Sequence, residues 1–157
     1  MSVTASERYG VLLMTYGSPV SLDDMPRYLA AVRGGREPSD ELVTEFRRRY
    51  EVIGGSPLIA ITTAQAAALE ERLGGGALVR AAMRFSAPTI GDALSELTRE
   101  GITNVIGIVM SPQYSELVMG GYRRAIGEAI ATLGAEAPDV RLAGSWHLEP
   151  HFISALA

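Results

Sequence analysis

Four short apolar runs divide the chain, and their spacing constrains the fold more than any other feature. The runs cover residues 9–16, 77–85, 104–111 and 139–146. Segments with helical periodicity separate the last three runs, and strands that alternate with helices are typical of a parallel sheet with helices on both faces. We therefore expect an α/β fold of the flavodoxin or Rossmann type, with three layers around a parallel four-stranded sheet.

A helical insertion is predicted between the first two runs, which lie much farther apart than a strand-to-strand crossover requires. Ser21 and Asp24 form a capping-box-like start for its first helix, and Ser39 is a typical N-cap for its second. Gly54 is expected to end the second helix, and Ser56 precedes the proline that opens the third. We expect this insertion to form a lip beside a binding edge.

Ligands of open parallel sheets bind beyond the carboxyl ends of the strands. Four segments are expected at that edge: 15–19, 84–88, 111–115 and 145–150. In the first segment, Tyr16 closes a strand and precedes Gly17, which lets a ligand approach the backbone closely. Tyr16 is therefore a candidate ligand contact, although a strand-end tyrosine with its hydroxyl in water is the more common case.

Three consecutive arginines, Arg47–Arg49, form the densest charge cluster of the sequence. Successive helical residues point in different directions, so at most two of the three can face one ligand. Arg33 and Arg36, at the end of the preceding helix, could join them as a funnel for an acidic ligand. The alternative is a solvated basic face that is partly offset by acidic residues of the same helix.

Three weaker candidates remain open. Gly54-Gly55-Ser56 could bind an anion through backbone N–H groups before a helix, although the same residues simply start helices. Gly120-Gly121 in mid-helix costs stability unless a flat ligand or, more commonly, a neighbouring helix packs there. His147 and His151 have a spacing that can bind metal on a helix, but Pro150 lies between them, so the pair need not share a face.

Composition excludes several classes of function. The 157 residues suit a single domain over 1–157, and a net charge of −4 gives no general attraction to nucleic acid or an anionic membrane. The chain has no cysteine, which excludes disulfides, thiolate metal sites and a cysteine nucleophile. The start lacks the features of a signal peptide, and no apolar run approaches the length of a membrane span. We expect a cytoplasmic location.

Several segments resemble the ferrochelatases, most closely the bacterial coproporphyrin ferrochelatases. They are GVLLMTYGSP, YLAAVRGGREP, RRYEVIGGSPL, the alanine-rich helix to Leu73, GITNVIGIVMSPQYS and SWHLEP. The resemblance runs from Tyr9 to Phe152 and implies a chelatase-like fold. In that family two similar parallel-sheet domains enclose a porphyrin cleft, and this chain matches the N-terminal domain only.

The resemblance also implies the roles of individual residues. Tyr16 corresponds to the tyrosine that ligates the iron of the porphyrin product. The residues that hold the porphyrin and its propionates would be Arg33, Arg49, Tyr50, Ser56 and Tyr122. The family's metal-handling histidine and glutamate belong to the second domain, so no catalytic residue is expected in this half.

The implied function is that of the N-terminal portion of a ferrochelatase, a lyase of haem biosynthesis that inserts ferrous iron into coproporphyrin III or protoporphyrin IX. Ferrous iron is the substrate and no organic cofactor is implied. The expected partners are the porphyrin and the missing C-terminal domain, without which this half should be inactive. The alternatives are a non-catalytic tetrapyrrole- or haem-binding module and a small homodimeric metal chelatase.

Overall fold

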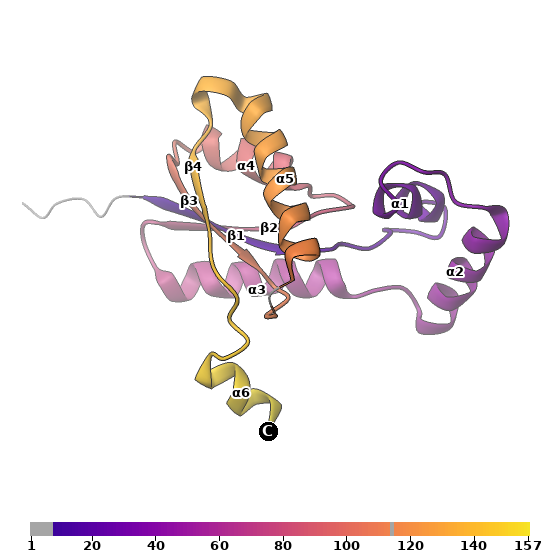
Figure 1. Ribbon diagram of the computed structural model, residues 1–157. Helices are drawn as coiled ribbons and strands as arrows, with labels where there is room; N and C mark the ends of the chain where they lie inside the picture. Colours follow the sequence, from indigo (N-terminus) through magenta and orange to yellow (C-terminus); the bar gives the residue numbers. More distant parts are fainter. Residues whose placement is uncertain (1–7, 114) are drawn as a thin grey trace, which may run out of the picture.

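A computed structural model describes residues 8–113 and 115–157, and its centre is a parallel sheet (Figure 1). Residues 1–7, where no signal peptide was predicted, and position 114 lie outside the described residues. The strands are β1 (Tyr9–Thr15), β2 (Ala77–Met83), β3 (Asn104–Val109) and β4 (Asp139–Leu142), in the order β2-β1-β3-β4. All the described pairs are parallel, which confirms the predicted four-stranded sheet.

Helices cover both faces of the sheet, as predicted. In β1, Leu12 and Met14 face a core shared with α4 (Ile90–Arg99) and α5 (Glu116–Leu133). The alternate residues Val11 and Leu13 face α3 (Leu58–Leu73) on the other side. Because both faces of β1 are buried, its sequence is continuously apolar rather than alternating.

The insertion after β1 forms α1 (Met25–Val32) and α2 (Asp40–Ile53), which project past the carboxyl end of β1 before α3 returns along the sheet (Figure 1). The two helices share a small apolar cluster of their own, to which Phe85 also packs. We call α1, α2 and this cluster the lip. Ser39 caps α2 by accepting from the N–H of Leu42 at 3.3 Å, and Gly54 ends it with a φ of 73°, both as predicted.

The predicted start of the first helix at Ser21 was wrong. The Ser21 hydroxyl accepts from the Asp24 N–H, while the Asp24 carboxylate accepts from the Val20 N–H. These bonds close a turn, and the helix begins only at Met25, where Pro26 fits the first helical turn.

The strands are shorter than predicted at their carboxyl ends. β1 ends at Thr15 rather than at Tyr16, and β3 ends at Val109 rather than at residue 111. β4 ends at Leu142, because beyond Ala143 the chain leaves β3 and forms a loop in which the Trp146 N–H donates to Pro112 O at 3.0 Å. The short 3-10 helix η1 (Gly134–Glu136) precedes β4, and α6 (Pro150–Leu156) ends the chain.

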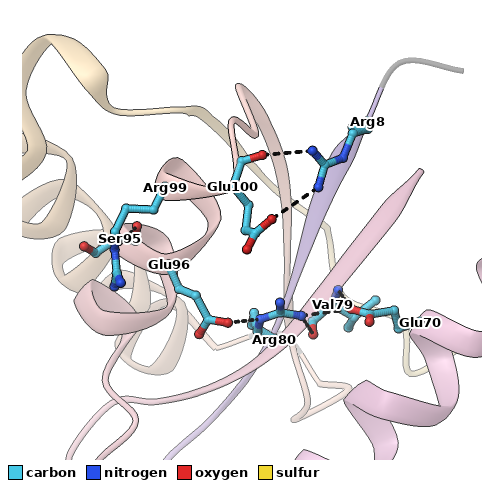
Figure 2. A network of polar contacts seen from close by, with 8 residues as sticks. All are labelled: Arg8, Glu70, Val79, Arg80, Ser95, Glu96, Arg99 and Glu100. Carbon is cyan, nitrogen blue, oxygen red and sulfur yellow. Dashed lines mark hydrogen bonds and ion pairs between the residues drawn. The ribbon is translucent and has the colours of Figure 1, made fainter. Parts of the chain in front are cut away.

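Polar side chains cover the free edge of β2, the first strand in the sheet order (Figure 2). The outward N–H of Val79 donates to the Glu70 carboxylate at 2.7 Å, and its carbonyl accepts from Arg80 at 2.9 Å. Arg80 also pairs with Glu70 of α3 and Glu96 of α4. One arginine therefore joins the helices of both faces across this edge.

No single helix among the described residues is long and apolar enough to cross a membrane. The consecutive helices α2 and α3 reach that length and apolar composition only when they are taken together, and the pair is bent by 58°.

Candidate functional site

The loop after β1 is held rigidly at the carboxyl edge of the sheet. Gly17 has a φ of 87°, and a Cβ there would overlap the Ser86 hydroxyl, so glycine is required for both reasons. The Ser18 N–H donates to Ser86 Oγ at 3.2 Å, and the Tyr28 hydroxyl donates to Gly17 O at 3.2 Å. The loop is thus tied both to the segment after β2 and to α1, and these ties fix the backbone that carries Tyr16.

Tyr16 lies beside an arginine in a cluster of aromatic rings. The Arg84 guanidinium lies 5.8 Å from the Tyr16 ring centre, 4.6 Å from that of Phe85 and 5.7 Å from that of Tyr122. Tyr16 and Phe85 meet edge to face at 4.8 Å. The Tyr16 side chain is nevertheless 40% exposed, so it can contact a ligand beyond the sheet. As expected, the residue directly follows β1 at the carboxyl edge of the sheet.

Arg84 was not singled out from the sequence, although it opens one of the four segments expected at the edge. In the described part of the chain, its guanidinium makes no hydrogen bond and no ion pair, and it lies against aromatic rings and against Gly121. Its position directly after β2 was the available signal. What the sequence could not show is that the rings of three different segments meet around it.

The structure also explains one glycine of the mid-helix pair in α5. A Cβ on Gly121 would overlap the guanidinium of Arg84, whereas a Cβ on Gly120 would meet only a Glu116 carboxylate oxygen at 4.0 Å. The flat group that packs on Gly121 is therefore an arginine of the same chain. At Gly121 this contact takes the place of the ligand or neighbouring helix that was expected, whereas Gly120 has no comparable contact.

A groove of about 640 Å³ opens between the loop after β1, the end of α2 and the start of α3. Tyr50 and Ser56, two of the predicted porphyrin contacts, line it together with Ser18 and Ile59. Burial raises the pKa of the Tyr50 phenol, so it remains a neutral hydrogen-bond donor. The groove combines apolar walls with hydroxyl groups, as sites for amphipathic ligands do.

Two backbone N–H groups of the glycine turn in this groove are not available for the anion site that was considered. The Gly54 N–H donates to Glu51 O at 3.2 Å and the Gly55 N–H to Tyr50 O at 2.9 Å, because both close the end of α2. Ser56 Oγ accepts from the Leu58 N–H at 3.3 Å. The Ser56 hydroxyl proton therefore remains a donor that this turn can offer to a ligand.

The arginines of α2 diverge, as predicted. Arg47 turns toward α1 and donates to Leu22 O at 3.0 Å. Arg48 and Arg49 both pair with Glu45, at 3.0 and 2.8 Å. The hydrogen bond from Arg48, followed by that from Arg49, lowers the pKa of Glu45 to about 2. The interpretation as a solvated basic face offset by acidic residues therefore holds for Arg48 and Arg49 as the structure stands.

Arg33 lies at the end of α1, where its carbonyl accepts from Arg36 Nε at 3.2 Å. Neither Arg33 nor Arg49 is among the described residues that line the groove. Tyr122 is only 1% exposed, and desolvation raises the pKa of its phenol. Of the predicted contacts, Tyr50 and Ser56 thus line one groove. Tyr16 is accessible and precedes the loop that borders this groove, whereas Tyr122 is buried in the core beside Arg84.

The two histidines do not form a metal centre with each other. Pro150 begins α6, so His147 precedes the helix and His151 lies within it. His147 Nδ1 is buried and has no hydrogen-bond partner among the residues described, while the His151 N–H donates to the Glu149 carboxylate at 2.6 Å. Over ranges 8–113 and 115–157, no group of three or more histidine or acidic side chains could hold a metal ion.

The fold and this edge define a class: an open parallel α/β domain with a candidate ligand site at the carboxyl edge of its sheet, bordered by a helical lip. A family model described as Ferrochelatase matches residues 8–157. The chain belongs to the ferrochelatase family.

Similar proteins carry the same name. A coproporphyrin III ferrochelatase of Anoxybacillus flavithermus is 37% identical over 92% of this chain and 47% of its own length. A ferrochelatase of Deinococcus radiodurans is 39% identical over 99% of this chain and 50% of its length. A coproporphyrin III ferrochelatase of Listeria monocytogenes is 34% identical over 97% and 50%. The chain spans about half the length of these curated relatives, which fits the predicted match to an N-terminal portion.

Proposed function

We propose that the chain is the porphyrin-binding half of a ferrochelatase and that coproporphyrin III is its porphyrin. The observation that carries the proposal is the accessible Tyr16 at the carboxyl edge, next to the lip, in a chain of the ferrochelatase family. The names of two relatives support coproporphyrin III in particular. The proposed reaction takes ferrous iron and the free porphyrin to iron coproporphyrin and two protons, as a step of haem biosynthesis.

The residues of this half would bind and orient rather than move protons. Tyr16 would ligate the iron of the product, and the hydroxyls of Tyr50 and Ser56 would bind polar groups of the porphyrin within the groove. Metal insertion also needs a base that receives two pyrrole protons. We assign that base to the second half, so the chain alone is expected to bind a porphyrin without metallating it.

Arg33 and Arg49 would bind propionates from the rim of the lip. Arg49 is paired with Glu45, but its side chain is 59% exposed and that of Glu45 39% exposed. Ion pairs this exposed contribute little to stability, so the exchange of Glu45 for a propionate costs little. A planar guanidinium can then bind the carboxylate through two hydrogen bonds.

The test is an anaerobic assay of the purified chain with coproporphyrin III and ferrous iron, followed by the visible spectrum, and a parallel titration with iron coproporphyrin. We expect binding of both porphyrins, and a ligation spectrum that disappears in Tyr16→Phe. Tyr9→Phe is the matched control, because Tyr9 lies at the other end of the same strand. Equal spectra of the wild type and Tyr16→Phe would remove Tyr16 from the proposal.

The assay also separates the two alternatives. The binding module is favoured by the fact that Tyr16 and the groove both belong to this chain, and it predicts binding without insertion even when the second half is added. Insertion by the chain alone, with a rate that rises as the square of its concentration, would indicate the homodimeric chelatase. Insertion only after addition of the second half supports the proposed ferrochelatase.

A further inference from the structure

We propose that Arg84 is a positioning residue that fixes the orientation of the Tyr16 ring, and that Gly121 exists to seat it. The inference rests on the proposed role of Tyr16 as the iron ligand, and it concerns a residue outside the set implied by the family resemblance. Its consequence is that ligation by Tyr16 depends on a side chain that need not touch the iron itself.

The contacts of Arg84 select this role. An arginine at a sheet edge ordinarily pairs with a carboxylate, but within the described residues this guanidinium makes no hydrogen bond or ion pair and lies against three aromatic rings and Gly121. A cation that lies near aromatic faces is attracted to their π electrons, and a planar guanidinium can also stack on a ring. The guanidinium lies within 6 Å of the Tyr16 and Tyr122 ring centres at once, so it links the accessible ring to the buried one.

Gly121 supplies the space that the Arg84 guanidinium occupies against α5. A glycine in the middle of α5 destabilises the helix, and a Cβ at this position would overlap the Arg84 guanidinium. The neighbouring Gly120 has no such contact. The missing side chain at position 121 therefore allows the guanidinium to lie against the helix backbone, between that helix and the ring of Tyr16.

Tyr16 is thereby supported from more than one direction. Phe85 packs edge to face on it at 4.8 Å, and the Phe85 N–H donates to Tyr16 O at 3.1 Å, so ring and backbone are both held. The Arg84 guanidinium is the third neighbour. A metal–oxygen bond requires the phenol at a defined distance and angle, and side chains locked by packing supply that geometry before the ligand arrives.

The two glycines of α5 provide the first experiment, which needs no porphyrin. In the apo protein with isotopically labelled tyrosine, Gly121→Ala is expected to shift and broaden the NMR signals of the Tyr16 ring, because the new Cβ displaces Arg84. Gly120→Ala is the matched control and should leave them unchanged, since both substitutions raise helix propensity equally. Equal signals in Gly121→Ala and the wild type, or equal shifts in both variants, would overturn the proposal.

A second pair of variants covers the case in which Gly121→Ala does not fold. Arg84→Met keeps an unbranched apolar stem and removes the planar cation, so it should shift the Tyr16 signals while those of Tyr9, at the far end of β1, stay in place. Arg84→Lys keeps the positive charge but not the planar group, so its Tyr16 signals should lie between those of Arg84→Met and those of the wild type. Tyr16 signals that are the same in both variants as in the wild type would contradict the positioning role.

Iron coproporphyrin then tests the consequence. Arg84→Met is expected to bind it with nearly unchanged affinity but to show a mixed ligation spectrum, whereas the exposed Arg141→Met should behave as the wild type. An unaltered ligation spectrum in Arg84→Met would overturn the positioning role. If the wild type itself shows no tyrosine ligation, the proposed function fails, while the apo NMR result still decides whether Arg84 orients Tyr16.

Discussion

At the scale of single residues, Tyr28 shows how the lip and the edge are joined. Its ring lies in the lip cluster, and its hydroxyl donates to Gly17 O in the loop that carries Tyr16. Burial raises the pKa of its phenol to about 12, because the charged form would lose its hydration. The folded protein therefore keeps a proton that the unfolded chain releases near 10.

This shift predicts how stability depends on pH. Above about 10 the unfolded chain binds fewer protons than the folded one, so the free energy of unfolding should fall with pH until Tyr28 itself ionises near 12. Tyr28→Phe should lose about 1 kcal/mol at neutral pH, with the hydrogen bond to Gly17, but decline less steeply in alkali. Urea unfolding across this range, with Tyr9→Phe as control, measures both effects. Parallel alkaline slopes in the wild type and Tyr28→Phe would contradict the prediction.

Sequence patterns predicted residues whose role is local and missed those whose role depends on distant neighbours. Ser39 and Gly54 act within their own helix, so their types and spacing sufficed. The N–H groups of Gly54 and Gly55 looked available for an anion, but a pattern cannot show that they already bond to α2. Arg84 was missed for the same reason, since apart from the adjacent Phe85 its partners lie on two other segments of the chain, the end of β1 and α5.

At the scale of elements, β2 is an edge strand whose outward backbone groups are satisfied by side chains. Glu70 accepts the Val79 N–H, and Arg80 donates to the Val79 carbonyl while it pairs with helices on both faces (Figure 2). Free backbone groups on an outer strand are a template for pairing with another chain. These two side chains therefore protect the edge as well as join the layers.

Removal of this protection should lower stability and promote association. Glu70→Ala leaves the Val79 N–H and the Arg80 guanidinium with fewer partners and should cost about 1–3 kcal/mol. Glu71→Ala, an exposed neighbour on α3, is the control and should cost far less. Urea unfolding measures the cost, and light scattering over a concentration series measures association. A Glu70→Ala protein as stable and monodisperse as the control would show that the edge is protected by other means.

Boundaries of elements were predicted less well than their presence. The strands were expected to extend as far as their apolar residues, but a strand ends where its backbone turns away from its neighbour, as β4 does beyond Leu142. The first helix was misplaced because a serine that closes a turn looks the same in sequence as one that caps a helix.

At the scale of the whole molecule, the chain consists of a large sheet core and a small lip. The core joins both faces of β1 to three helices, whereas the lip cluster has four buried members among the described residues: Met25, Tyr28, Leu29 and Val43. The alternation of apolar runs and helices was enough to predict the sheet and the existence of the lip. It could not predict the position of the lip relative to Tyr16, which depends on the Ser18 and Tyr28 hydrogen bonds.

This division predicts unequal resistance to local opening. Elements that bury few apolar side chains open at a lower free energy than the core. The backbone amides of α1 and α2 should therefore exchange with solvent at least tenfold faster than those of β1, as measured by hydrogen–deuterium exchange. Iron coproporphyrin should slow exchange in the lip more than in the strands, if the lip borders the porphyrin. Equal protection of α2 and β1 in the free protein would mean that the two parts open as one.

The protected edge of β2 also predicts the outcome of a mutational screen of this chain. Arg80 lies within the strand rather than at its carboxyl end, and its contacts are with Glu70, Val79 and Glu96. We expect a loss-of-function screen to score Arg80 substitutions as damaging, because chains with an unprotected β2 edge associate with one another and less folded protein remains. In such a screen the yield of folded protein, not the activity per molecule, would separate Arg80 from Arg84, for which we propose a role in positioning Tyr16.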